Sequence, residues 1–86
     1  MADSTIHFYG ADWCGDCRRS KKVFERTGVA YVLHDVEHDE GAAQEAQRVS
    51  GQKHIPVIAF EDGTVLVEPS DPELTKKLNE LGLVQA

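Results

Sequence analysis

The stretch FYGADWCGDC, residues 8–17, decides the fold of this chain because it joins a strand-like segment to a helical one. The β-branched and aromatic run TIHFY, at 5–9, predicts a strand. Further on, apolar side chains recur at helical spacing among cationic ones, which predicts a helix over 15–27. Both cysteines of the protein, Cys14 and Cys17, therefore fall where the chain passes from strand to helix.

The segments that follow repeat this alternation. AYVLHDV at 30–36 predicts a second strand, and the helical connection predicts that it runs parallel to the first one. An alanine-rich helix is expected at 39–50, because Asp39 suits its N-terminus and Gly51 suits the position after its last turn. The apolar side chains of this helix are small, so it can pack closely against a sheet.

The C-terminal third predicts a hairpin followed by a helix. Strands are expected at 56–60 and 64–67, and the Asp62-Gly63 pair between them is a strong hairpin signal. A last helix is expected to begin at SDPEL, with Ser70 or Asp71 as its cap. The element order βαβαββα predicts an α/β fold in which three helices cover a mixed four-stranded sheet.

Length and charge limit the classes of function. With 86 residues, the chain is expected to form a single domain over residues 1–86. Its net charge of −6 disfavours nucleic acid and anionic membranes as partners. Five of the nine basic residues nevertheless follow the cysteines closely: Arg18, Arg19, Lys21, Lys22 and Arg26. We expect them to form a solvated helix face that raises the electrostatic potential near Cys14.

The N-terminal residues MADSTIHFYG contain no basic segment followed by an apolar run, so no secretory signal is expected. No run of apolar residues approaches transmembrane length. We therefore expect a cytoplasmic protein that acts as a monomer. In that compartment thiols are normally kept reduced, and the disulfides that do form tend to be transient and catalytic.

The chemistry is expected at the cysteine pair. Cys14 lies at the first helical turn, where free backbone N–H groups and the helix dipole favour a thiolate over a thiol. Cys17 follows three residues later on the same helix face. One sulfur can therefore attack a target disulfide while the other resolves the mixed disulfide that results.

Other interpretations of the pair are weaker. A structural disulfide would close a very small loop, and such loops give little stabilisation. A zinc site would need two further ligands, and the four histidines are scattered, so we expect no metal. Two inert buried cysteines are disfavoured because Gly15 and Asp16, between them, are poor core residues.

Ile55-Pro56 is the second notable feature. A proline that opens a strand removes one backbone donor and leaves its neighbour's backbone open for pairing. A trans bond here would be an ordinary strand start. A cis bond would turn the backbone toward the cysteines, where a disulfide substrate could lie alongside. The residues alone do not decide between a cis and a trans Ile55-Pro56 bond.

These segments together resemble the thioredoxin superfamily and, within it, the glutaredoxin family. WCGDC, at 13–17, is similar to the W-C-x-x-C active site of the superfamily, and KHIPVI, at 53–58, is similar to its cis-proline segment. The ending FEDGTVLVEPSDPEL looks most like the mycoredoxins, the glutaredoxin-like proteins that use mycothiol. The resemblance implies a thioredoxin-like fold and a cis Ile55-Pro56 bond.

The resemblance also implies roles for individual residues. Cys14 matches the nucleophile and Cys17 the resolving cysteine. The positions that match the binding site for a small thiol are Lys53, Ile55, Pro56, Ser70 and Asp71. In this site the lysine holds a carboxylate, the isoleucine backbone pairs with the thiol compound, and the helix start binds the γ-glutamyl end of glutathione. Asp71 could equally be only a helix cap.

Two departures from the family pattern affect the choice of small thiol. Asp16 stands where glutaredoxins usually have Tyr or Phe, and its charge should oppose both a thiolate and a carboxylate-bearing ligand. Glu68-Pro69 replaces the glycine pair that lets glutathione approach closely. We therefore expect mycothiol as cosubstrate, with glutathione as the alternative. Trp13 is expected either to contact substrates beside the thiol or to brace the loop.

The predicted function is thiol–disulfide oxidoreduction through Cys14, with thiolated or disulfide-bearing proteins as partners. Two alternatives stay open. The protein could be an electron donor that a flavin disulfide reductase such as thioredoxin reductase recharges. It could also hold an iron–sulfur cluster between two copies through Cys14 and an exogenous thiol, as some glutaredoxins do.

Overall fold

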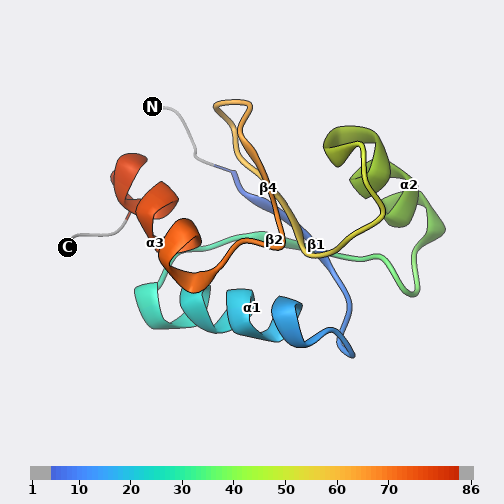
Figure 1. Ribbon diagram of the computed structural model, residues 1–86, viewed down its shortest axis with the longest axis horizontal. Helices are drawn as coiled ribbons and strands as arrows, with labels where there is room; N and C mark the ends of the chain where they lie inside the picture. Colours follow the sequence, from blue (N-terminus) through green and yellow to red (C-terminus); the bar gives the residue numbers. More distant parts are fainter. Residues whose placement is uncertain (1–4, 84–86) are drawn as a thin grey trace.

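The computed structural model of the chain describes residues 5–83, and its elements follow the predicted order (Figure 1). Four strands form one sheet in the order β2-β1-β3-β4. β1 pairs in parallel with β2 and antiparallel with β3, which pairs antiparallel with β4. The strands are β1 (His7–Gly10), β2 (Val32–Asp35), β3 (Val57–Ala59) and β4 (Val65–Val67). The mixed four-stranded sheet is therefore confirmed.

The strands are shorter than, or shifted from, the predicted segments. β1 begins two residues later than predicted and includes Gly10, which the pattern placed after the strand. The Ile6 carbonyl nevertheless accepts a hydrogen bond from the Val32 N–H at 2.8 Å, so pairing extends beyond the strand itself. Strand ends depend on the pairing partner, which the local pattern does not contain.

Three helices cover the two faces of the sheet (Figure 1). α1 (Gly15–Thr27) and α3 (Asp71–Glu80) pack against each other on one face, and α2 (Glu40–Ser50) lies on the other. Asp39 caps α2 by accepting a hydrogen bond from the Ala42 N–H at 3.2 Å. None of the helices within residues 5–83 has the length and apolar character needed to cross a bilayer.

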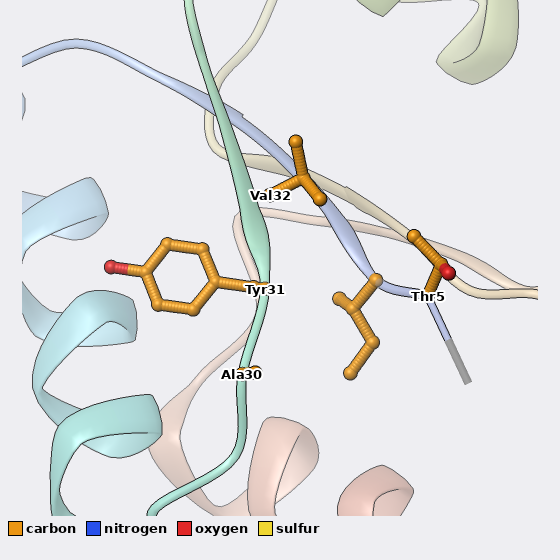
Figure 2. Close-up of a pocket in the computed structure, with 5 residues that line it drawn as sticks. Thr5, Ala30, Tyr31 and Val32 are labelled. Carbon is orange, nitrogen blue, oxygen red and sulfur yellow. The ribbon is translucent and has the colours of Figure 1, made fainter. Parts of the chain in front are cut away.

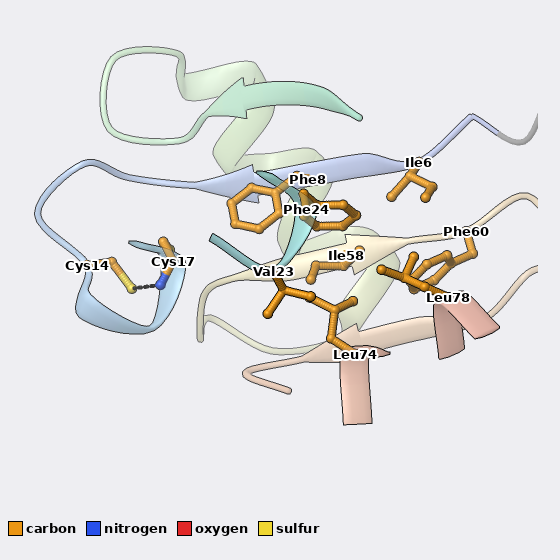
Figure 3. Close-up of a cluster of buried hydrophobic side chains, with 10 residues drawn as sticks. All are labelled: Ile6, Phe8, Cys14, Cys17, Val23, Phe24, Ile58, Phe60, Leu74 and Leu78. Atoms are coloured by element: carbon orange, nitrogen blue, oxygen red, sulfur yellow. Dashed lines mark hydrogen bonds between the residues drawn. The ribbon is translucent and has the colours of Figure 1, made fainter. Parts of the chain in front are cut away.

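The core divides into two clusters because successive strand residues point to opposite faces. Phe8 of β1 faces α1 and α3, whereas Tyr9, the next residue, faces α2. The larger cluster lies between the sheet and the helix pair, where Phe24 of α1 and Leu78 of α3 are fully buried (Figure 3). The two cysteines lie at one end of this cluster, so the active pair is built on the main core.

Candidate active site at the start of α1

Cys14 is the N-cap of α1, with extended backbone angles of φ −82° and ψ 117°. Its Sγ accepts a hydrogen bond from the Cys17 N–H at 3.2 Å (Figure 3). The sulfur thus takes the place that a Ser, Thr or Asp oxygen usually has at a helix start. The residue is only 7% exposed. A negative charge on this sulfur would be stabilised by the free N–H groups of the first turn.

Cys17 lies inside the first turn of α1 and is fully buried. Burial, and next the hydrogen bond with Cys14, raise the pKa of Cys17 to about 12. Cys17 is therefore a neutral thiol near neutral pH. Both cysteines are reduced in this structure. The two sulfurs consequently differ in environment although they belong to one short motif.

Gly10 is a site residue that the sequence pattern did not identify. A Cβ at this position would lie 2.7 Å from Cε1 of Phe8 and 2.9 Å from Sγ of Cys17. Real side chains do not approach so closely, so only glycine leaves room for the buried sulfur. The one signal in the sequence is a glycine at the end of a strand just before the cysteines, which is also an ordinary stop signal.

The Ile55-Pro56 peptide bond is cis, as the resemblance implied. The Ile55 carbonyl oxygen lies 3.9 Å from Sγ of Cys14, although the two residues are 41 positions apart in the sequence. Pro56 is fully buried at the start of β3. The structure therefore brings two of the predicted site residues, Ile55 and Pro56, beside the cysteine pair.

Lys53 is exposed in the loop before this proline. A shallow pocket between α2 and the loop is lined by Lys53 and Ile55, together with Val36, Ala43, Ala46, Gln47, Gln52 and His54. In the described part of the chain, Lys53 forms no ion pair, so its charge is available to a ligand.

Glu68 lies at the end of β4 and reaches the same loop. Its N–H donates a hydrogen bond to the Pro56 carbonyl at 2.9 Å, and its carboxylate lies 3.3 Å from Nδ1 of His54. Its φ is 48°, in the left-handed region that non-glycine residues rarely adopt. This left-handed backbone stands at the position where the family pattern has glycine. Glu68 therefore places a carboxylate on a backbone conformation that usually favours glycine.

At the start of α3, Ser70 and Glu73 are already hydrogen-bonded to each other. The Ser70 hydroxyl accepts a hydrogen bond from the Glu73 N–H at 3.2 Å, and the Ser70 N–H donates to the Glu73 carboxylate at 2.9 Å. This is a capping box. A ligand at Ser70 would have to displace Glu73. Asp71 is the half-buried first residue of the helix.

Trp13 and Asp16 lie on the rim of the site. Trp13 is 65% exposed, which fits contact with a substrate better than bracing of the loop. Asp16 forms an ion pair with Arg19, so its negative charge is partly neutralised on its own helix. Because both side chains are largely exposed, this pair offsets the charge only in part, and the conflict between Asp16 and an anionic ligand stays a prediction.

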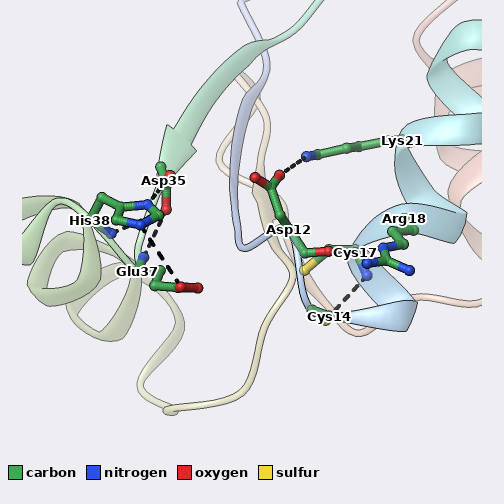
Figure 4. Close-up of polar contacts among 8 residues, drawn as sticks. All are labelled: Asp12, Cys14, Cys17, Arg18, Lys21, Asp35, Glu37 and His38. Atoms are coloured by element: carbon green, nitrogen blue, oxygen red, sulfur yellow. Dashed lines mark hydrogen bonds and ion pairs between the residues drawn. The ribbon is translucent and has the colours of Figure 1, made fainter.

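Two further features of the structure are an ion pair after β2 and a pocket far from the cysteines. After β2, the Nδ1–H of His38 donates a hydrogen bond to the Asp35 carboxylate at 2.8 Å, and this bond raises the pKa of His38 and lowers that of Asp35 (Figure 4). A pocket lined by Thr5, Ile6, Ala30, Tyr31 and Val32 lies at the opposite end of β1 from the cysteines (Figure 2). Its lining contains no sulfur and no charged side chain.

The sequence model of the glutaredoxin family matches residues 6–66, which include the cysteine pair and the cis proline. The chain belongs to the glutaredoxin family. This membership gives the protein a redox function, and the pair Cys14 and Cys17 is its C-x-x-C motif.

Two relatives are similar to this glutaredoxin over most of its length. A candidate glutaredoxin of Mycobacterium tuberculosis is 34% identical over 79 residues, which cover 91% of this chain and 94% of the relative. Mycoredoxin 1 of Corynebacterium glutamicum is 33% identical over 79 residues, which cover 91% of this chain and 98% of the relative. The likeness to mycoredoxins inferred from the C-terminal segment is thus supported over 91% of the chain.

Solved structures share the fold. The glutaredoxin-like NrdH-redoxin of Escherichia coli has a TM-score of 0.71 at 22% identity, with 84% of this chain and 92% of the other covered. A buckwheat glutaredoxin in complex with glutathione has a TM-score of 0.67 at 21% identity, with coverage of 95% and 83%. The thioredoxin-like fold predicted from the element order and the resemblance is therefore confirmed.

Proposed function

We propose that this glutaredoxin is a thiol–disulfide oxidoreductase in which Cys14 is the nucleophile and Cys17 the resolving thiol. The observation that supports this assignment is the difference between the two sulfurs. The Cys14 sulfur accepts an N–H at the start of α1, whereas Cys17 is a buried thiol with a pKa raised to about 12. Only Cys14 is placed to react first, because its sulfur lies at the edge of the core and faces the N–H groups of the first turn of α1.

In the first step the Cys14 thiolate attacks one sulfur of a disulfide between a protein and a small thiol. A bond forms between Cys14 and that sulfur, and the original S–S bond breaks. The protein leaves as a thiolate that takes a proton from water. The Ile55 backbone, 3.9 Å from the Cys14 sulfur, is positioned to run alongside the bound thiol compound.

The resulting mixed disulfide can be cleared in two ways. A second small thiol can attack the small-thiol sulfur of the mixed disulfide. The two small thiols then form a disulfide with each other, and Cys14 is released as a thiolate. Alternatively, Cys17 can lose its proton and attack Cys14, which forms the Cys14–Cys17 disulfide and releases the small thiol. We infer that the first route serves thiolated proteins. When Cys14 instead attacks a disulfide within a protein, the mixed disulfide holds that protein. The attack of Cys17 on Cys14 then releases the protein as a thiolate, which takes a proton from water. We infer that this second route serves protein disulfides, in a cytoplasmic monomer.

We propose mycothiol as the small thiol, with glutathione as the alternative. Lys53 and the Ile55 backbone flank one pocket, so a ligand bound there would contact both. Glu68 adds a carboxylate at the edge of this site, and Ser70 is already used by the helix cap. A ligand rich in hydroxyl groups fits such surroundings better than one that ends in carboxylates, because a carboxylate accepts hydrogen bonds from hydroxyls and repels another carboxylate.

The test is to compare Cys14→Ser and Cys17→Ser with the wild-type protein. We expect Cys14→Ser to lose all turnover, because a serine hydroxyl is not ionised near neutral pH. We expect Cys17→Ser to keep the removal of a small thiol from a thiolated protein and to lose the reduction of protein disulfides. Turnover in each assay is measured with mycothiol, glutathione and thioredoxin reductase supplied separately as the reducing system.

The Cys17→Ser variant also allows the bound thiol to be identified. Its mixed disulfide cannot be resolved internally, so the mass of the trapped adduct names the small thiol on Cys14. Full activity of Cys14→Ser would contradict the mechanism. Reduction by thioredoxin reductase alone, with neither small thiol active, would show that the protein is an electron donor instead.

A further inference from the structure

Lys21 lies on α1 one helical turn after Cys17, on the face that the helix presents to the active site. Its side chain is only 19% exposed, whereas the next residue, Lys22, is exposed to solvent. Long cationic side chains normally remain in water. The partial burial of Lys21 beside the buried thiol therefore needs an explanation.

Asp12 holds this side chain in place (Figure 4). The Lys21 Nζ lies 3.5 Å from Oδ1 of Asp12, in the loop that leads from β1 to Cys14. Arg18 fixes the same loop residue, because its Nε donates a hydrogen bond to the Asp12 carbonyl at 2.8 Å. Two cations of α1 thus fasten the loop, and only Lys21 does so from a partly buried position.

The resolving step requires Cys17 to lose its proton although the residue is fully buried. The groups around its sulfur come from two segments. The loop and β1 contribute the Ala11 backbone and the uncharged Gly10, and α1 contributes Cys14 and Lys21. Burial, and next the hydrogen bond with Cys14, raise the pKa of Cys17, while the Ala11 backbone and, to a smaller extent, the Lys21 ammonium lower it. Among residues 5–83, Lys21 is the one cation that acts on Cys17 in this way.

We propose that Lys21 is a positioning residue for the resolving step: its ammonium, anchored on Asp12, stabilises the Cys17 thiolate as it attacks Cys14. This inference rests on the proposed function. In the step, Cys17 gives its proton to water, and its sulfur bonds to the sulfur of Cys14. The bond between Cys14 and the bound thiol breaks, and the released thiolate takes a proton from water. One disulfide replaces another, so no external oxidant or reductant is needed.

The experiment uses Ellman's reagent with the reduced full-length protein. Attack by Cys14 releases one coloured thiolate, and attack by Cys17 on the mixed disulfide releases a second, so the two steps are separated in time by stopped-flow absorbance. The variants are Lys21→Gln, which removes the charge, and Lys21→Arg, which keeps it. Lys22→Gln is the matched control, because it removes the same charge from the exposed side of the same helix.

We expect Lys21→Gln to slow the second release about threefold at neutral pH and to shift its pH profile upward. A threefold slowing corresponds to a thiolate fraction about tenfold smaller, because the greater nucleophilicity of the more basic thiolate restores about threefold of the rate. Lys21→Arg should restore the wild-type profile, and Lys22→Gln should match it.

An unchanged second release in Lys21→Gln, across the pH range, would overturn the role of Lys21. Far-UV circular dichroism shows that each variant is folded, and the first release shows that Cys14 still attacks, so the two together report on the proposed function separately. Loss of both releases in the wild-type protein would instead contradict the proposed function. A second release that Lys22→Gln slows as much as Lys21→Gln would show a general charge effect and would also overturn the proposal.

Discussion

At the scale of single residues, two cysteines three positions apart have opposite environments. Cys14 ends the loop and faces the N–H groups of the first turn, whereas Cys17 points into the core beside Gly10. The spacing of the motif explains why they can meet. It does not explain why one is buried, because that depends on the space left by a residue of β1. The burial of the Cys17 sulfur therefore depends on Gly10 as well as on the cysteine motif.

We expect Gly10→Ala to destabilise the protein by about 1–3 kcal/mol, because an added Cβ would overlap Phe8 and the Cys17 sulfur in a closely packed core. The shift of Cys17 should reduce protein-disulfide reduction more than removal of a small thiol, which does not need Cys17. Urea unfolding and the two activity assays measure this. Gly15→Ala is the control, because a Cβ there meets only the Arg19 guanidinium at 3.9 Å. Equal losses in both variants would contradict the expected clash.

At the scale of elements, the β3–β4 turn is tied to α3 by an ion pair. Asp62 of the turn accepts a hydrogen bond from the Thr64 N–H at 2.9 Å, and its other oxygen lies 2.6 Å from Nζ of Lys77. Lys77 also lies over the ring of Phe60, 5.6 Å from the centroid. The hairpin signal in the sequence accounts for the turn, but the contact with α3 appears only when the elements pack.

This pair predicts a change of stability with pH. The bond from Lys77, and next the bonds from Thr64, lower the pKa of Asp62 from 3.8 to about 2. Because the pKa of Asp62 is lower in the folded state, the ionised carboxylate stabilises the fold. This contribution to the free energy of unfolding is fully present above pH 3.8 and is lost as the pH falls toward about 2. We expect Asp62→Asn to unfold more readily at neutral pH and to lose less stability on acidification across this range. Urea titrations of the variant and the wild-type protein measure both effects, and identical pH dependence would contradict the assignment.

At the scale of the whole molecule, the site for a small thiol joins segments that are far apart in the sequence. Cys14 comes from the β1–α1 junction, Lys53 and Ile55 from the loop before β3, and Glu68 from the end of β4. The central strands β1 and β3 bring these segments to one end of the sheet. The charge of this assembled site, rather than any one motif, should determine which small thiol is accepted.

We expect Lys53→Gln to lower turnover with glutathione about two- to fivefold, the effect of losing one exposed charge pair. Turnover with mycothiol, which lacks the carboxylate ends of glutathione, should change little. Steady-state assays with each thiol measure this. Lys76→Gln on α3 removes the same charge from an exposed position and should change neither. An equal loss with both thiols would show that Lys53 does not recognise a carboxylate.

The order of elements, the helix caps and the place of the cysteine pair follow from the sequence, because hydrogen bonds and side-chain periodicity act within a few residues. The capping of α3 by Ser70 and the hairpin at Asp62-Gly63 are examples. The resemblance to a family added the cis proline, which the residues alone left open.

The tertiary structure alone decided which distant groups meet. It placed Ile55 beside Cys14, Gly10 against Cys17, and Glu68 beside His54. Burial and long-range contact depend on how the sheet and helices pack, and no short pattern of residues contains that information.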